Sequence, residues 1–373
     1  MPVGLYIHVP FCLSKCPYCD FYSLTLAADD ELLDRYTTAV ETALDLWADR
    51  LRCPADTLYF GGGTPSLLGG ERLTRLIEKA AHRFSLKGAE ITLEANPADA
   101  DGANKLAETL QAFAEAGGNR LSLGMQSSSE DELRRLGRRH GPTAVSHAVE
   151  AAHKAGLANI SLDLMLAVEG QDEASVRRSA AFCGKLEAAH VSAYLLKIEE
   201  QTPFGQRDDL KLPEEDEAAA LYLAACEALE ESGFRQYEIS NFAQSGRESR
   251  HNLKYWTGAP YLGIGPAAHS CIDGRRFAYP RDLMAFLAGT EPRPEDGGWI
   301  RTGSPEEFLL LRLRLTEGLT EAAHIARFGI PIPEIWRKRA VSLPRHLVVS
   351  DPQGIRLTRE GFLVSNAILA ELL

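Results

Sequence analysis

Three cysteines near the start of the chain have the spacing of a metal site. Cys12, Cys16 and Cys19 form the pattern C-x3-C-x2-C. Thiolates are soft ligands that suit zinc or iron–sulfur centres. An ordinary electron-transfer [4Fe–4S] cluster takes four cysteine ligands, so three would leave one iron open to a ligand that is not protein. The alternative is a structural zinc site with His8 or a distant fourth ligand, but such sites usually pair two cysteine knuckles and this chain has one.

A glycine run follows the next predicted strand. Gly61, Gly62 and Gly63 precede Thr64 and Pro65, and glycines there allow backbone polar groups to approach a ligand closely. The run lacks the Gly-Lys-Ser/Thr ending of a phosphate-binding loop, which argues against a nucleoside triphosphate.

Composition limits the class of protein. The chain has 373 residues, of which 45% are hydrophobic and 25% charged, as expected for one large globular domain with an appendage. A net charge of −12 argues against non-specific nucleic-acid binding. We expect no signal peptide and no transmembrane segment, because no apolar run approaches about 18 residues. The other four cysteines, Cys53, Cys183, Cys226 and Cys271, are scattered, which favours a reducing cytoplasm over a disulfide framework.

The elements that must position these residues alternate along the first two-thirds of the chain. Short apolar strands are expected at Gly4–His8, Thr57–Phe60, Ile91–Ala95, Arg120–Gly124, Ile160–Leu164 and His190–Leu195. The spacing between them leaves room for a crossover helix each time, so the sheet should be parallel. We therefore predict an α/β fold: a partial (β/α)6, TIM-like barrel over residues 1–235, with a doubly wound sheet as the alternative.

The remainder of the chain differs in pattern. Residues 236–290 concentrate aromatic side chains between turn signals, and residues 291–304 have the composition of a linker. Residues 300–373 predict a mostly helical, winged-helix-like appendage: helices near 305–317, 320–328 and 332–340, a hairpin of 347–349 and 355–357, and a last helix from about 360.

Together, the cysteine spacing and the Gly-Gly-Gly-Thr-Pro run resemble those of the radical S-adenosylmethionine (SAM) enzymes. The resemblance implies a [4Fe–4S] cluster on Cys12, Cys16 and Cys19, with SAM bound to the fourth iron and the Gly62–Thr64 run near its methionyl amino group. It also implies that an electron from the cluster cleaves SAM to a 5′-deoxyadenosyl radical inside a dry barrel, where the protein positions and shields the cofactor.

The resemblance extends over nearly the whole chain to the coproporphyrinogen dehydrogenase-like branch of these enzymes. The motif entering the cluster and four downstream motifs match in type and spacing. They imply SAM-binding roles for Tyr6, Tyr18, Glu94, Gln126, Arg138 and Asp163. Glu94, Gln126 and Asp163 also fall at the carboxyl ends of predicted strands, the functional rim of such barrels.

Two features distinguish subgroups of this branch. Phe21 stands where the porphyrinogen dehydrogenases have an additional cysteine, and only eleven residues precede Cys12, whereas those enzymes carry a long N-terminal extension. His251, Asn252, Tyr255 and Trp256 form an H-N-x-x-Y-W motif similar to that of haem chaperones with the radical SAM fold. The similarity implies haem as a ligand, with His251 as the iron-binding residue, and transfer of haem to an acceptor haem protein, for which a respiratory protein is one candidate. From physics alone the favoured interpretation is that Tyr255 and Trp256 are core residues and that His251 is a buried hydrogen-bonding residue.

Three functions remain open. The favoured hypothesis is a cytoplasmic haem chaperone; the alternative is an oxygen-independent coproporphyrinogen III oxidase, which converts propionates to vinyl groups. A radical SAM enzyme acting on RNA is disfavoured by the acidity of the chain. Two loops depart from the branch's pattern: Leu166–Gln171 lacks an expected glycine and proline, and Gly265–His269 has an alanine where a glycine is expected.

Overall fold

The main sheet is built from β/α units in chain order. The computed structural model describes residues 1–25, 29–97, 103–295 and 300–373. In the described residues six adjacent parallel strands follow one another: β1 (Val3–Val9), β4 (Ala55–Gly62), β5 (Glu90–Ala95), β6 (Arg120–Gln126), β7 (Ile160–Leu166) and β8 (His190–Leu195). The predicted strands and their parallel pairing are confirmed, as is the partial TIM-like barrel. The cysteine loop leaves β1 through β2 (Phe11–Cys12), which pairs with β3 (Leu24–Thr25).

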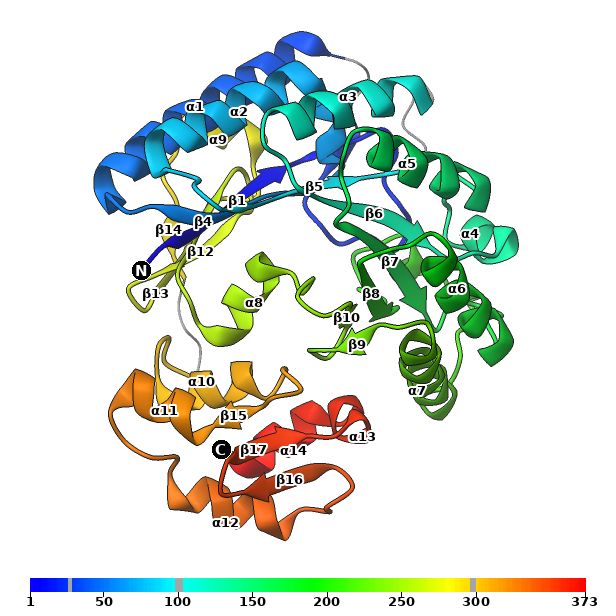
Figure 1. Ribbon diagram of the computed structural model, residues 1–373, viewed down its shortest axis with the longest axis vertical. Coiled ribbons are helices and arrows are strands. Elements are labelled where there is room, and N and C mark those ends of the chain that lie inside the picture. The colour runs from blue at the N-terminus through cyan, green and yellow to red at the C-terminus, as the bar shows by residue number, and fades with distance from the viewer. Residues whose placement is uncertain (26–28, 98–102, 296–299) are drawn as a thin grey trace.

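Helices cover the outer, convex face of the curved sheet (Figure 1). They are α1 (Asp30–Leu51), α2 (Gly69–Phe84), α3 (Ala103–Glu115), α4 (Glu130–Arg135), α5 (Pro142–Lys154), α6 (Glu173–Lys185) and α7 (Glu215–Glu231), with 3-10 turns η1 (Pro65–Leu68) and η2 (Phe204–Gln206). In α2, the apolar residues recur at helical spacing and are buried, among them Leu73, Leu76 and Phe84. Burial of this face explains why the helix packs on the sheet.

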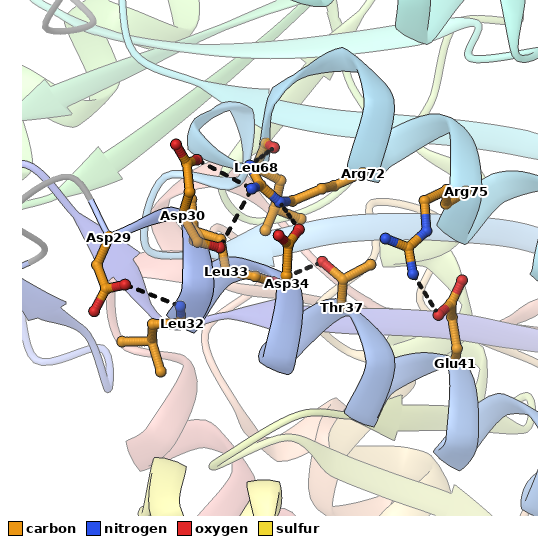
Figure 2. Close-up of polar contacts among 10 residues, drawn as sticks. All are labelled: Asp29, Asp30, Leu32, Leu33, Asp34, Thr37, Glu41, Leu68, Arg72 and Arg75. Carbon is orange, nitrogen blue, oxygen red and sulfur yellow. Dashed lines mark hydrogen bonds and ion pairs between the residues drawn. The ribbon is translucent and has the colours of Figure 1, made fainter.

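Ion pairs join α2, the helix after the glycine run, to α1 (Figure 2). Arg72 contacts Asp34 at 2.7 Å and Asp30 at 3.0 Å, and Arg75 contacts Glu41 at 2.9 Å. Arg72 also donates a hydrogen bond to the Leu68 carbonyl, at the start of α2. Single surface pairs contribute little, but a network of this kind restrains two helices together. It therefore helps to fix the end of the loop that carries the glycines.

Strands from residues 235–294 extend the same sheet at both edges. They are β9 (Arg235–Gln236), β10 (Asn241–Ala243), β11 (Tyr261–Ile264), β12 (His269–Ile272), β13 (Arg275–Ala278) and β14 (Arg293–Pro294). β11 lies parallel to β1, and β10 lies antiparallel to β8. The proposed boundary at residue 235 remains a prediction. Within the expected linker, residues 293–294 form a strand, and residues 296–299 lie outside the described part.

One helix of this region lies inside the curve of the sheet. α8 (Arg250–Thr257) occupies the concave side, between the barrel strands and the C-terminal region (Figure 1). The Glu90 carboxylate, at the start of β5, accepts hydrogen bonds from the backbone N–H groups of Arg250 and His251 at 3.1 and 3.0 Å. A carboxylate at a helix N-terminus satisfies free N–H groups and favours the helix dipole. α9 (Leu283–Leu287) instead packs against α1 on the outside.

The C-terminal region has a hydrophobic core of its own, which includes Leu309, Trp336, Ile355 and Leu369. Its elements are α10 (Pro305–Arg312), β15 (Leu319–Thr320), α11 (Glu321–Phe328), α12 (Glu334–Ser342), β16 (Val348–Asp351), β17 (Gly354–Leu357), α13 (Arg359–Leu363) and α14 (Ser365–Leu372). The expected hairpin is confirmed, and β15 adds a third strand to it.

Two boundaries in this region were wrong. The helix expected over 305–317 ends at Arg312, because Leu315 pairs with Glu238 of the aromatic 236–290 segment and Thr316 N donates to the Tyr237 carbonyl. The expected last helix is divided into α13 and α14 near Val364, whose φ and ψ are −114° and 23°. Among the described residues no helix is both long and apolar enough to cross a bilayer.

Candidate cofactor site

A cavity of about 510 Å³ lies along the inner side of the parallel strands. Most of the residues predicted to bind the cluster or SAM line it: Cys12, Cys16, Tyr18, Cys19, Gly62, Gly63, Thr64, Glu94, Gln126, Arg138 and Asp163. They come from the cysteine loop and from β4 to β7 with the segments after them. Residues separated by up to 151 positions in the sequence are thus brought together at one site, because parallel strands direct their carboxyl ends to one rim.

The cysteine loop and the glycine run are held against each other by backbone hydrogen bonds. Gly63 N donates to the Val9 carbonyl at 2.8 Å, and Thr64 N donates to the Phe11 carbonyl at 2.7 Å. The Thr64 hydroxyl lies 3.7 Å from the Cys12 sulfur. The cysteine loop and the glycine run therefore form one rigid unit.

The three thiols fit an iron–sulfur cluster better than a zinc ion. Within the described part of the chain, no three His, Cys, Asp or Glu side chains gather closely enough to hold a single metal ion. His8, the proposed fourth zinc ligand, has both ring nitrogens engaged, with Tyr6 Oη at 3.1 Å and the Tyr22 carbonyl at 2.8 Å. A [4Fe–4S] cluster binds each thiolate to a different iron and so spreads its ligands around a larger volume.

Burial affects the protonation of this loop. It raises the pKa of the Cys12 and Cys19 thiols, and hydrogen bonds from Thr64 to Cys12 and from the backbone to Cys19 oppose the shift. The Arg138 guanidinium donates to Cys16 Sγ at 3.2 Å, a contact that stabilises negative charge on that sulfur. Iron binding to Cys12 and Cys19 should therefore release protons at neutral pH.

Gly62 and Gly63 have no room for a side chain, because other residues lie close to their Cα atoms. Gly62 has a φ of +113°, and a Cβ there would lie 2.7 Å from the His8 ring. A Cβ on Gly63 would lie 2.5 Å from the Phe11 carbonyl oxygen. Any side chain would push the two loops apart, so the glycines form a cradle at the edge of the cavity.

Two buried carboxyls face the cavity from neighbouring strands. Glu94 accepts hydrogen bonds from Tyr59 Oη at 2.8 Å and Gly62 N at 3.1 Å, and burial raises its pKa to about 7. Asp163 accepts a hydrogen bond from Ser122 Oγ at 3.3 Å, and burial raises its pKa to about 6. Carboxylates in such a setting are suited to a cationic ligand and to hydroxyl donors, both of which SAM offers.

Gln126 and Arg138 line the cavity beside the cysteines. Gln126 has a φ of 68°, a conformation that costs a non-glycine residue about 1–2 kcal/mol and that is typical of functional sites. Besides Cys16, Arg138 contacts Asn96 Oδ1 and the Gly124 carbonyl. Asn96 in turn donates to Thr64 Oγ1 at 2.8 Å, so Arg138 links the cysteine loop to β5 and β6.

Two predicted residues do not line this cavity. Tyr6 packs against Tyr59 and His251 and hydrogen-bonds to His8, so it supports the wall from behind. His251 is 1% exposed. Its Nδ1 is 2.8 Å from Thr57 Oγ1 and its Nε2 is 2.9 Å from Tyr255 Oη. Burial lowers its pKa to about 3. The imidazole is therefore neutral, with both nitrogens engaged, and its role as a haem ligand remains a prediction.

Several residues that line the cavity were not predicted from the sequence. They include Tyr59, Asn96, Arg120, Ser122, Ser192, Tyr194, Leu195 and Asn252. In β6 the lining residues are Arg120, Ser122, Gly124 and Gln126, which alternate with buried Leu121, Leu123 and Met125. This period of two along a predicted strand was visible in the sequence. By contrast, Asn252 reaches the cavity only because α8 lies inside the sheet.

In each of the two atypical loops an alanine adopts a backbone conformation that glycine ordinarily takes. Ala167 has a φ of 60° and Ala267 a φ of 64°. Both are in the left-handed region, which costs an alanine about 1–2 kcal/mol. Alanine in place of glycine therefore leaves both loops with a strained backbone.

The fold and the site define the class of protein. Residues 6–183 match the Radical SAM superfamily, and the structure of coproporphyrinogen III oxidase (HemN) from Escherichia coli superimposes with a TM-score of 0.81 at 20% identity, covering 100% of this chain and 90% of that one. The fold of HemN is thus present throughout this chain.

Sequence comparison places the chain more narrowly. It is 36% identical to the heme chaperone HemW of Mycobacterium tuberculosis, over 100% of this chain and 95% of the relative. It is 33% identical to the heme chaperone HemW of Escherichia coli, over 99% of this chain and 97% of the relative. This chain belongs to the HemW family of radical SAM proteins.

Proposed function

We propose that this chain is a haem chaperone of the cytoplasm. It holds a [4Fe–4S] cluster on Cys12, Cys16 and Cys19, and SAM against the glycine run, Glu94, Gln126, Arg138 and Asp163. It binds haem and transfers it to an acceptor haem protein, for which a respiratory protein is one candidate. When bound, the cluster and SAM would supply one-electron chemistry; the protein residues bind, orient and shield them.

The observation that carries the proposal is an exposed apolar rim beside the cluster loop. Phe21 is 67% exposed, and Tyr194 and Leu195 are 40% and 39% exposed. All three line the same cavity as the cysteines. Large apolar side chains in water are costly, and several around one opening indicate a surface that meets an apolar partner. A flat tetrapyrrole macrocycle fits such a rim, since aromatic rings pack on its face.

Phe21 also separates this proposal from the enzyme alternative. The resemblance places a further cysteine at this position in the porphyrinogen dehydrogenases, whereas here an apolar side chain is directed to solvent. Phenylalanine in place of that cysteine therefore weighs against the enzyme alternative.

The test is a haemin titration of the anaerobically reconstituted, full-length protein. Wild type should show a shifted Soret band that saturates near one equivalent. Phe21→Ser should weaken haemin binding by about tenfold, since burial of an aromatic side chain stabilises by about 1.5–3 kcal/mol. The control is Met284→Ser, an equally exposed apolar side chain on α9, which should leave binding unchanged. Equal haemin affinity in all three proteins would show that the apolar rim does not bind haem.

Coproporphyrinogen III oxidation is the second candidate, because the residues predicted to bind SAM, apart from Tyr6, line one cavity. Incubation with coproporphyrinogen III, SAM and a reductant distinguishes the two. The chaperone proposal expects no protoporphyrinogen, and turnover with decarboxylation would establish the enzyme.

A further inference from the structure

Arg120 is a buried cation at the inner end of the cavity. It is the first residue of β6, is 1% exposed, and is the largest fully buried side chain among the described residues. It lines the cavity together with Ser122 and Gln126 of the same strand. A guanidinium out of water is costly unless an anion and hydrogen-bond acceptors compensate for lost hydration.

This compensation is absent from the part of the chain that the structure describes. Among the described residues, no group within hydrogen-bond distance accepts from the Arg120 side chain, no carboxylate pairs with it, and its Nε is buried without a partner. Other buried arginines are paired: Arg138 contacts Cys16, Asn96 and Gly124, and Arg312 contacts the Gly318 carbonyl and Glu317. Arg120 is therefore an exception that requires an explanation.

The nearby carboxyls are engaged elsewhere. Glu94 accepts from Tyr59 and Gly62, Asp163 accepts from Ser122, and Glu90 accepts from two N–H groups of α8. The charge of Arg120 lowers the pKa of Glu94 and of Asp163, but in both cases burial has a larger effect and raises it. The two carboxyls do not neutralise Arg120 by contact.

The histidines around Arg120 are neutral and also occupied. His190 contacts Ser161 Oγ at 2.8 Å and Tyr237 Oη at 2.9 Å, and His251 contacts Thr57 and Tyr255. Burial lowers the pKa of both imidazoles; the charge of Arg120 adds to this for His190, and the charges of Lys254 and then Arg120 add to it for His251. The inner end of the cavity is thus a pocket of neutral donors and acceptors around one unpaired positive charge.

We infer that Arg120 is a binding residue for a carboxylate of the ligand that fills the cavity. A guanidinium presents parallel N–H donors that match a carboxylate, and in a dry cavity such a pair is strong. The carboxylate could be a propionate of a tetrapyrrole or the amino-acid carboxylate of SAM. Arg120 and Gln126 are at opposite ends of β6, roughly 20 Å apart at about 3.3 Å per residue. SAM is expected at the Gln126 end, so the position of Arg120 favours the propionate.

This inference rests on the proposed haem-binding function, and the test separates the two. The cluster-loaded, full-length protein is titrated with haemin, with haemin dimethyl ester and with SAM. Wild type should bind haemin about tenfold or more tightly than the ester, because only haemin carries free carboxylates. Arg120→Gln should weaken haemin binding about 10- to 100-fold, the size expected for a charged hydrogen bond, and leave the ester and SAM unchanged. Arg120→Lys should have a haemin affinity between those of wild type and Arg120→Gln. It replaces Arg120→Gln if that variant fails to fold.

The outcomes are distinct. Arg312→Gln removes a paired buried arginine in the C-terminal core and should change none of the three affinities. Loss of SAM affinity alone in Arg120→Gln would assign the bound carboxylate to SAM. Unchanged affinities for haemin and SAM in a folded variant would overturn the inference. A wild-type protein that binds neither haemin nor its ester would overturn the proposed function, and the SAM titration of the same variants would then decide the role of Arg120.

Discussion

The guanidinium of Arg138 lies 3.2 Å from the sulfur of Cys16 and joins two parts of the site that are 122 positions apart in the chain. The same side chain contacts Asn96 and the Gly124 carbonyl. Through these contacts Arg138 fixes the cysteine loop against the ends of β5 and β6. The predicted cluster loop is therefore positioned by a residue that is itself predicted to bind SAM.

Cys16→Ala should abolish the brown iron–sulfur chromophore. Two thiols cannot replace the three-thiolate set, and the anchor of Arg138 is lost together with the ligand. The measurement is the visible absorbance and the iron content after anaerobic reconstitution. The control is Cys53→Ala, which removes a partly buried thiol outside the cavity and should keep the full chromophore. A complete cluster in Cys16→Ala would refute the assignment of this ligand.

Glu94→Gln should stabilise the protein without ligands at pH 8. Burial raises the pKa of this carboxyl from its ordinary 4.5 to about 7, so the folded state disfavours the ionised form. The cost is absent below about pH 4.5, grows as pH rises and is complete above about pH 7. The variant should therefore gain about 1–3 kcal/mol at pH 8 and much less at pH 5. Denaturant unfolding at both pH values measures this, with exposed Glu78→Gln as control.

The same carboxyl should make SAM binding depend on pH. SAM carries positive charge, so its affinity should rise between pH 6 and 8 as Glu94 ionises, and Glu94→Gln should bind weakly and lack that rise. A wild-type affinity that is flat over this interval would show that Glu94 does not contact the charged part of SAM.

Ala167→Gly and Ala267→Gly should each stabilise the fold by about 0.5–1 kcal/mol. Glycine adopts the left-handed conformation without strain, and this gain exceeds the entropy that glycine adds to the unfolded chain. Thermal unfolding measures the effect. Ala180→Gly inside α6 is the opposite case and should destabilise by about 1 kcal/mol. Destabilisation by the two loop substitutions would mean that the alanine methyl groups contribute packing larger than the strain.

His251 can bind haem iron only after one of its hydrogen bonds breaks. Tyr255→Phe removes the partner of Nε2 and should increase haemin affinity. His251→Ala should shift the Soret maximum of the bound haem and lower stability by about 2–3 kcal/mol, since the Thr57 and Tyr255 hydroxyls lose their partner. An identical Soret spectrum in wild type and His251→Ala would leave His251 with a structural role alone.

The sequence predicted the parts of the site that depend on local pattern. The strands could be identified from short apolar runs, and the cysteine and glycine motifs from spacing. The inward position of α8 could not be predicted, since it depends on the bonds from Glu90 to Arg250 and His251, and the sequence separation between them is 160 and 161 positions. The burial of Arg120 was missed for a different reason: a charged residue at the start of an apolar strand is ordinarily exposed, whereas Arg120 is buried.

Anaerobic haemin titration of the wild-type chain, with its cluster in place, decides whether this protein binds haem. We expect a shifted Soret band that saturates near one equivalent of haemin. A titration that remains equal to that of free haemin throughout would contradict it.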